Sequence, residues 1–182
     1  MSAPAKPGGP GPSACRIARF GLIVTDIERA GRFFATAFGF TPTSRVAGDS
    51  GFADLVGVPG AMTRQTHLRL GGQELVLVAF DLAGRPYPPG STSSDLWFQH
   101  LAIIVADIDA AQAQVREAAR IMPITEGGPI RLPCASGGAR AFKFRDEDGH
   151  PLELLEFHPE ATPEAWRPGS QPGVFLVIAL RM

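Results

Sequence analysis

A histidine and a glutamate set into apolar runs are the residues of this chain best suited to chemistry. His100 opens the run that ends at Asp107, and Glu153 interrupts the run between Pro151 and Phe157. An imidazole and a carboxylate brought together could ligate a divalent metal ion, or act as a general base with its orienting partner. They could equally form a buried hydrogen bond that only maintains sheet geometry. Either reading needs a fold that brings the two positions together.

Other polar side chains have plainer interpretations. Arg19 stands at the entrance of an apolar run, where its guanidinium could bind an anionic substrate or only carry a solvated charge. Lys143 and Arg145 lie beside three acidic residues, 146–148, and are expected to form exposed ion pairs of little energetic weight. The remaining candidates are predicted to be solvated loop or surface residues: His150, His158, Glu74 and Glu156.

An internal repeat organises the chain. Arg19–Ile27 and His100–Ile108 match in character position for position, and each is an apolar strand that ends at an aspartate. Gly72–Phe80 and Gly149–Phe157 share Gly, Leu, Leu and Phe at identical spacing. The first two segments lie 81 residues apart and the second two 77, a drift that a change in loop length explains. The repeat pairs Arg19 with His100 and Val76 with Glu153.

Each half predicts the same order of elements, βαβββ. The first half has a strand and then a helix over 27–38, expected to begin with a capping box at Thr25–Glu28 and to end at Gly39. Strands near 40–46, 67–70 and 74–80 follow, and the last two form a hairpin. The second half has a strand over 98–105, a helix over 107–119, a poorly defined stretch where the repeat calls for the next strand, and strands over 140–144 and 151–157.

The predicted fold class is α+β, with two βαβββ modules forming a partly closed, trough-like mixed β-sheet and helices outside. The run Val174–Leu180 has no evident partner in the repeat. It could pair at a sheet edge, or begin a further module, which a strand after a linker favours. The boundaries are a disordered leader at 1–15, a first module at 16–81, a connector at 82–96, a second module at 97–158, and a Pro-rich linker with an apolar strand at 159–182.

Composition excludes several kinds of partner. Seventeen basic residues nearly cancel eighteen acidic ones, and no basic stripe suggests nucleic acid. The apolar runs are too short to cross a bilayer, so no membrane is expected. Cys15 and Cys134 lack CxxC spacing, which argues against a disulfide framework and favours a reducing cytoplasm.

Paired βαβββ modules with these motifs resemble the vicinal-oxygen-chelate superfamily, which includes glyoxalases, bleomycin-resistance proteins and extradiol dioxygenases. The likeness is carried by Gln99–Asp107 and by Phe144–Leu154, close to the family's F-R-D-P-x-G-x-x-x-E-L pattern, with Glu147 where the family has proline. Val24–Phe40 is similar to the family's first strand, helix and exit. The resemblance covers about residues 16–158 and is more specific for fold than for reaction.

The resemblance implies a trough that holds one divalent metal ion, with four ligand positions that fall on Arg19, Val76, His100 and Glu153. These are the four positions that the repeat pairs. Val76 has no donor atom and a guanidinium is practically never a ligand, so only His100 and Glu153 are competent. A catalytic Zn, Fe, Mn or Ni site normally needs three protein ligands, so the site is predicted to be degenerate, with one metal ion or none. A further ligand could come from Glu74, on the same strand face as Val76, or from His67 or His150, and Glu74 could also contact the substrate.

Two functions follow from this resemblance. One is an enzyme that acts on a small anionic or aromatic molecule, as a metal-dependent lyase or isomerase or as a ring-cleaving dioxygenase. In this enzyme His100 and Glu153 would be catalytic. Arg19, Val76 and Glu74 would contact the substrate. The other is a non-catalytic, resistance-type binding protein; a third reading is the inert module of a longer tandem enzyme. Open sheet edges predict a homodimer, with the trough closed within one chain or by exchange between two.

Overall fold

The computed structural model describes residues 19–88, 90–92, 94–95, 100–134, 138–158, 160 and 175–177. The predicted leader at 1–15, Cys15, and nearly all of the predicted linker lie outside these residues. In the described part of the chain, no helix is long and apolar enough to cross a membrane.

Helices and strands follow the predicted order in both halves. The first half contains β1 (Phe20–Ile23), α1 (Ile27–Phe38), β2 (Thr41–Asp49), α2 (Ser50–Leu55), β3 (Thr63–Leu70) and β4 (Gln73–Phe80). The second contains β5 (Leu101–Ile104), α3 (Ile108–Ala118), β6 (Met122–Pro123), β7 (Ile130–Arg131), β8 (Arg140–Arg145), β9 (Pro151–Glu156) and β10 (Phe175–Val177). The short helix α2 and the two-residue strands β6 and β7 lie where the sequence predicted only irregular chain.

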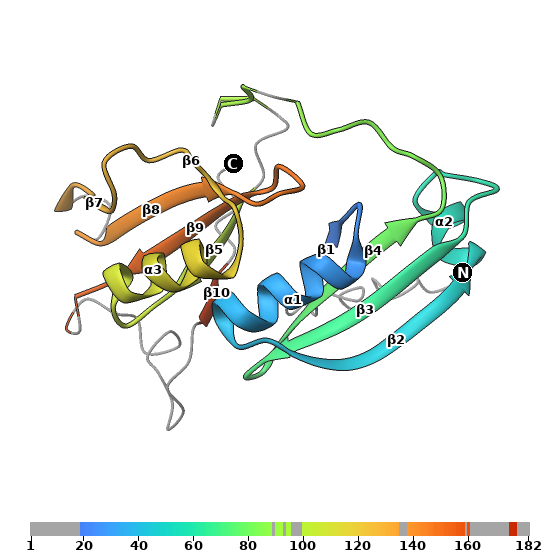
Figure 1. The fold of residues 1–182 in the computed structure, drawn as a ribbon, viewed down its shortest axis with the longest axis horizontal. Helices are drawn as coiled ribbons and strands as arrows, with labels where there is room; N and C mark the ends of the chain where they lie inside the picture. The colour runs from blue at the N-terminus through green and yellow to red at the C-terminus, as the bar shows by residue number, and fades with distance from the viewer. Residues whose placement is uncertain are drawn as a thin grey trace, which may run out of the picture.

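The strands form two separate mixed sheets, which confirms the α+β fold class. The first has the order β1-β4-β3-β2, and the second has the order β10-β5-β9-β8-β6, with β7 beside β8. Figure 1 shows the two sheets on either side of α1, not closed into a barrel. The module boundaries that we assigned remain predictions.

Strand register confirms the internal repeat. In the first sheet β1 runs parallel to β4 and places Gly21 opposite Val76. In the second sheet β5 runs parallel to β9 and places Ala102 opposite Glu153. The same offsets that relate the sequences, 81 for Gly21 and Ala102 and 77 for Val76 and Glu153, therefore relate equivalent points of the two sheets.

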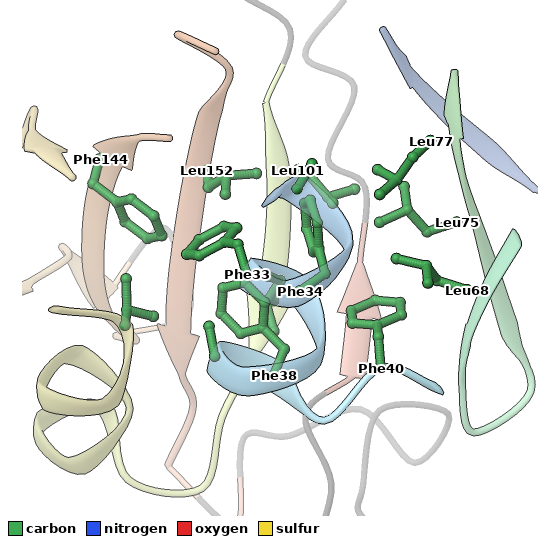
Figure 2. Packing of buried hydrophobic residues seen from close by; sticks show 14 of the residues in the cluster. Phe33, Phe34, Phe38, Phe40, Leu68, Leu75, Leu77, Leu101, Phe144 and Leu152 are labelled. Atoms are coloured by element: carbon green, nitrogen blue, oxygen red, sulfur yellow. The ribbon is translucent and has the colours of Figure 1, made fainter. Parts of the chain in front are cut away.

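One hydrophobic core joins the halves. Figure 2 shows the phenylalanines of α1 lying between leucines of the first sheet and leucines of the second. Phe34 is fully buried, and Leu75 and Leu152 are among the strand residues that face this core from the two sheets. Because side chains alternate along a strand, Val76 and Glu153 lie on the opposite faces of their sheets, away from α1 and α3.

The start of α1 differs from the predicted capping box. The N-cap is Asp26, whose carboxylate accepts hydrogen bonds from the backbone amides of Glu28 at 3.0 Å and Arg29 at 2.9 Å. The Thr25 hydroxyl donates instead to Asp148 of the second half. The predicted stop is confirmed, because Gly39 ends the helix with φ of 78°, a left-handed conformation that a glycine adopts without strain.

The C-terminal strand pairs at the edge of the second sheet. β10 is antiparallel to β5, with Leu176 opposite Ile103. Of the two readings of Val174–Leu180, edge pairing is therefore seen for Phe175–Val177. The reading of this run as the start of a further module stays a prediction.

Candidate active site on the second sheet

His100 and Glu153 lie together on the helix-free face of the second sheet. Nε2 of His100 is 3.0 Å from Oε2 of Glu153, and their side chains are 9% and 7% exposed. His100 directly precedes β5, and Glu153 is in the middle of β9, the parallel neighbour of β5. The hydrogen bond fixes the orientation of the imidazole and satisfies one oxygen of a buried carboxylate.

Lys143 completes this group, which we call the Glu153 cluster (His100, Lys143 and Glu153). Lys143 stands directly opposite Glu153 in the antiparallel pairing of β8 with β9. Its Nζ is 3.6 Å from Oε1 of Glu153, so each carboxylate oxygen faces a different nitrogen. The predicted ion pairs between Lys143 and the acids at 146–148 were wrong. Strand alternation could have indicated the contact, since residues opposite one another in a hairpin share a face.

The first sheet carries a second acidic group on its helix-free face. Nδ1 of His67, in β3, is hydrogen-bonded to Oε1 of Glu74, in β4. This hydrogen bond lowers the pKa of Glu74 although partial burial opposes it, and the charge of nearby Arg19 lowers it further. The Glu74 side chain is 27% exposed, so this predicted surface carboxylate is at the surface but paired with His67. His67 stands opposite Val76, as Lys143 stands opposite Glu153.

The five predicted site residues fall into two sets. His100 and Glu153 are in contact on the second sheet, whereas the exposed Arg19 lies near Glu74 on the first, with Val76 buried beside them. Among the described residues, no hydrogen bond or ion pair joins one set to the other. The roles of all five in catalysis or binding remain predictions.

A tightly bonded turn lies at the end of β8, and we call it the turn cluster (Asp146, Asp148 and His150). Asp146 accepts hydrogen bonds from the backbone amides of Asp148 at 3.0 Å and of His150 at 2.8 Å, and from Nδ1 of His150 at 2.9 Å. The His150 side chain is only 12% exposed, so its prediction as a solvated loop histidine was wrong. Arg145 donates to Gly149 and to Ser91 rather than to the acids of the turn.

The turn cluster binds the first half of the chain. Asp148 accepts hydrogen bonds from the backbone amide and hydroxyl of Thr25 and from Nη2 of Arg29, the last at 3.0 Å. Arg29 also pairs with Glu147 at 2.9 Å. Glu156 is not a plain surface carboxylate either, because it accepts from the amide of Ile108 at 2.7 Å.

Comparison with known proteins decides the family. The model of the Glyoxalase/Bleomycin resistance protein/Dioxygenase superfamily matches residues 16–154, most of the chain. The chain belongs to this superfamily. A comparison with curated proteins found no significant match.

Solved structures of glyoxalase-superfamily proteins share the fold. A glyoxalase family protein from Bacillus cereus aligns with a TM-score of 0.64 at 15% identity, over 80% of this chain and 96% of that one. A glyoxalase family protein from Enterococcus faecalis gives 0.57 at 22% identity, over 78% and 97%. A variant of the fosfomycin resistance protein FosX from Listeria monocytogenes, in complex with Mn(II) and 1S,2S-dihydroxypropylphosphonic acid, gives 0.53 at 16%, over 80% and 95%.

The Glu153 cluster of this superfamily member does not fit a three-ligand metal site. Two atoms bound to one ion at about 2.0–2.2 Å lie roughly 3 Å apart, so Nε2 of His100 and Oε2 of Glu153 are suitably spaced at 3.0 Å. The described residues provide no third ligand at this cluster. Among them, only the turn cluster has three metal-binding side chains close enough to share one ion. The ammonium of Lys143 beside the carboxylate also opposes a second cation.

The turn cluster has ligand atoms within 4.8 Å of one another, which is close enough to hold a metal ion. Its carboxylates are nevertheless engaged by Thr25, Arg29 and the turn's own amides and imidazole. A pocket of about 340 Å³ lies next to it, between α1 and the end of α3, and is lined by Arg29, Arg32 and the turn. The acids of the turn that line this pocket already bind the first half.

Proposed function

We propose that this superfamily member binds a small anionic or aromatic molecule against the helix-free faces of its sheets, with His100 and Glu153 as an acid–base pair. The observation that carries the proposal is the buried Glu153 cluster, in which a carboxylate orients an imidazole. In such a pair the carboxylate orients the imidazole, and the imidazole is the group that exchanges a proton with a substrate. This reaction class is proton abstraction, and none of its steps uses a metal ion.

A ligand with negative charge is supported by two observations. Arg19 is exposed and lies near the partly exposed carboxylate of Glu74. Its guanidinium can therefore bind the carboxylate or phosphonate group of a ligand. The FosX structures were solved with a phosphonic acid and with sulfate, and they share this fold. Binding without catalysis is the second candidate function, which the missing third metal ligand favours. We also keep the reducing cytoplasm as the proposed location.

Arg19→Ala should weaken binding of phenylphosphonate by about 1.5–3 kcal/mol, the contribution of a charge-assisted hydrogen bond. It should leave binding of benzyl alcohol, a neutral aromatic probe, nearly unchanged. Isothermal titration calorimetry of both probes into the parent and the variant measures the difference. Arg64→Ala is the matched control. Arg64 is also exposed and lies on β3, but it stands opposite Ala79 and so is on the other face of the sheet from Glu74.

Two outcomes contradict this proposal. If the parent protein binds neither probe, the small-anion function is wrong. If Arg19→Ala and Arg64→Ala weaken phenylphosphonate equally, Arg19 acts only through net charge and is not part of the site.

We further propose a homodimer. Among the described strands β1 pairs only with β4, so the other edge of β1 presents unpaired backbone groups that a second copy could cover. Light scattering at micromolar concentration should report twice the mass of the 182-residue chain. A single-chain mass would exclude a stable dimer and leave the trough to be closed within one chain.

A further inference from the structure

The chain uses lysine very sparingly. Of its 17 basic residues, the only lysines are Lys6 and Lys143, and Lys143 alone falls within the described residues. The other residues of this count are arginines. Lys143 stands opposite Glu153, the one glutamate that the family's metal-ligand pattern selects.

We propose that the ammonium group of Lys143 takes the place of a divalent metal ion at the Glu153 cluster and excludes such an ion from His100 and Glu153. The inference rests on the proposed location of the functional site at this cluster. It goes beyond that proposal by naming the residue that makes the site metal-free.

The geometry places the ammonium where it competes directly with an ion. Nζ of Lys143 is 3.6 Å from Oε1 of Glu153, and Nε2 of His100 is 3.0 Å from Oε2. An ion held by Nε2 and Oε2 would share this carboxylate with the ammonium. The Glu153 side chain is 7% exposed and that of Lys143 is 30% exposed, so water screens the repulsion between the two cations only in part.

The residue type fits this role better than arginine would. A lysine carries a compact point charge on a flexible stem, as a metal ion presents a compact charge, whereas a guanidinium is broad and planar. The first sheet provides an internal comparison. At the position equivalent to Glu153 it has Val76, and opposite Val76 stands His67, not a lysine. The lysine therefore occurs in the half that has a carboxylate at this position of the repeat.

Cobalt(II) titration of the full chain, purified without a polyhistidine tag, tests the inference through visible absorption and calorimetry. Lys143→Gln should raise the affinity of the Glu153 cluster for Co(II) at least tenfold. Lys143→His should raise it further, on the order of a hundredfold, because an imidazole opposite Glu153 offers a third ligand. Lys143→Arg keeps the charge and should show no gain.

The gain must disappear when Glu153→Gln is added to either variant, which separates this cluster from the turn cluster. The inference is overturned if the parent binds Co(II) at His100 and Glu153 as tightly as Lys143→Gln does, or if Lys143→Arg gains affinity equally. If the parent does not bind phenylphosphonate, the proposed function is contradicted, but the result of the metal titration still stands. Circular dichroism of each variant verifies that it is folded. If Lys143→Gln is not folded, Lys143→His, which also removes the ammonium group, is the variant compared with Lys143→Arg.

Discussion

Replacing Asp148 with alanine should lower the free energy of unfolding by about 3 kcal/mol, as expected when one partner of a largely buried charged network is removed. Asp148 accepts from the amide and hydroxyl of Thr25 and from Arg29, and its side chain is 6% exposed. The substitution leaves these donors without their acceptor and removes a polar link between the two halves. Urea denaturation followed by circular dichroism measures the change.

Two comparisons make this result specific. Asp148→Asn keeps an oxygen that can accept from Thr25 and should lose only about half as much. Asp109→Ala breaks a bidentate pair with Arg140 in which Asp109 is 64% exposed, so it should cost less than about 1 kcal/mol. Equal losses in Asp148→Ala and Asp109→Ala would mean that the turn cluster does not hold the halves together.

The sequence predicted the repeated framework because that framework depends on local pattern. Strand alternation and the shared Gly–Leu–Leu–Phe spacing place β4 and β9 in equivalent positions, and the register of Gly21 with Val76 agrees with that of Ala102 with Glu153. The turn cluster was not predicted because its partners are far apart in sequence. Asp148 and Thr25 are separated by 123 residues, and a turn that reads D-E-D-G-H looks solvated when its partner is unseen.

The candidate site was predictable to a similar extent. The repeat and the family pattern together selected His100 and Glu153, which the structure places in hydrogen-bond contact. They did not select Lys143 or His67, because a motif specifies residues along one strand, whereas these two contacts depend on which residue of the neighbouring strand stands opposite. Only the pairing of β8 with β9 shows that the carboxylate has a lysine beside it.

The pH dependence of stability should report on His150. Burial of its ring disfavours the charged form, but the hydrogen bond to Asp146 and the charges of Asp146 and Asp148 outweigh burial and raise the pKa of His150 above its ordinary value of 6.5. The backbone of Ile23 in the first half also favours the charged form. A protonated imidazole can donate from both ring nitrogens, to Asp146 and to Ile23, so it joins the halves more strongly than a neutral one.

The direction of the effect follows from linkage. A raised pKa in the folded state means that folding takes up protons, so this part of the stability is fully present below pH 6.5 and is lost as the pH rises through the folded-state pKa. Each unit by which the pKa is raised contributes about 1.4 kcal/mol. Compared with His150→Gln, the parent protein should therefore be most stabilised in mild acid, and the difference should shrink towards alkaline pH.

Urea unfolding of the parent and of His150→Gln, measured at intervals from about pH 5 to pH 9, isolates this contribution because every other titrating group is common to both. His158→Gln is the matched control, since His158 is exposed just beyond β9. The pH-dependent difference from the parent should be larger for His150→Gln than for His158→Gln. A difference between the parent and His150→Gln that grows with rising pH would show that burial dominates and that His150 is neutral in the folded protein. The hydrogen bond to Asp146 would then be an uncharged contact, and the polar links between the halves at this turn would be those of Asp148 and Glu147.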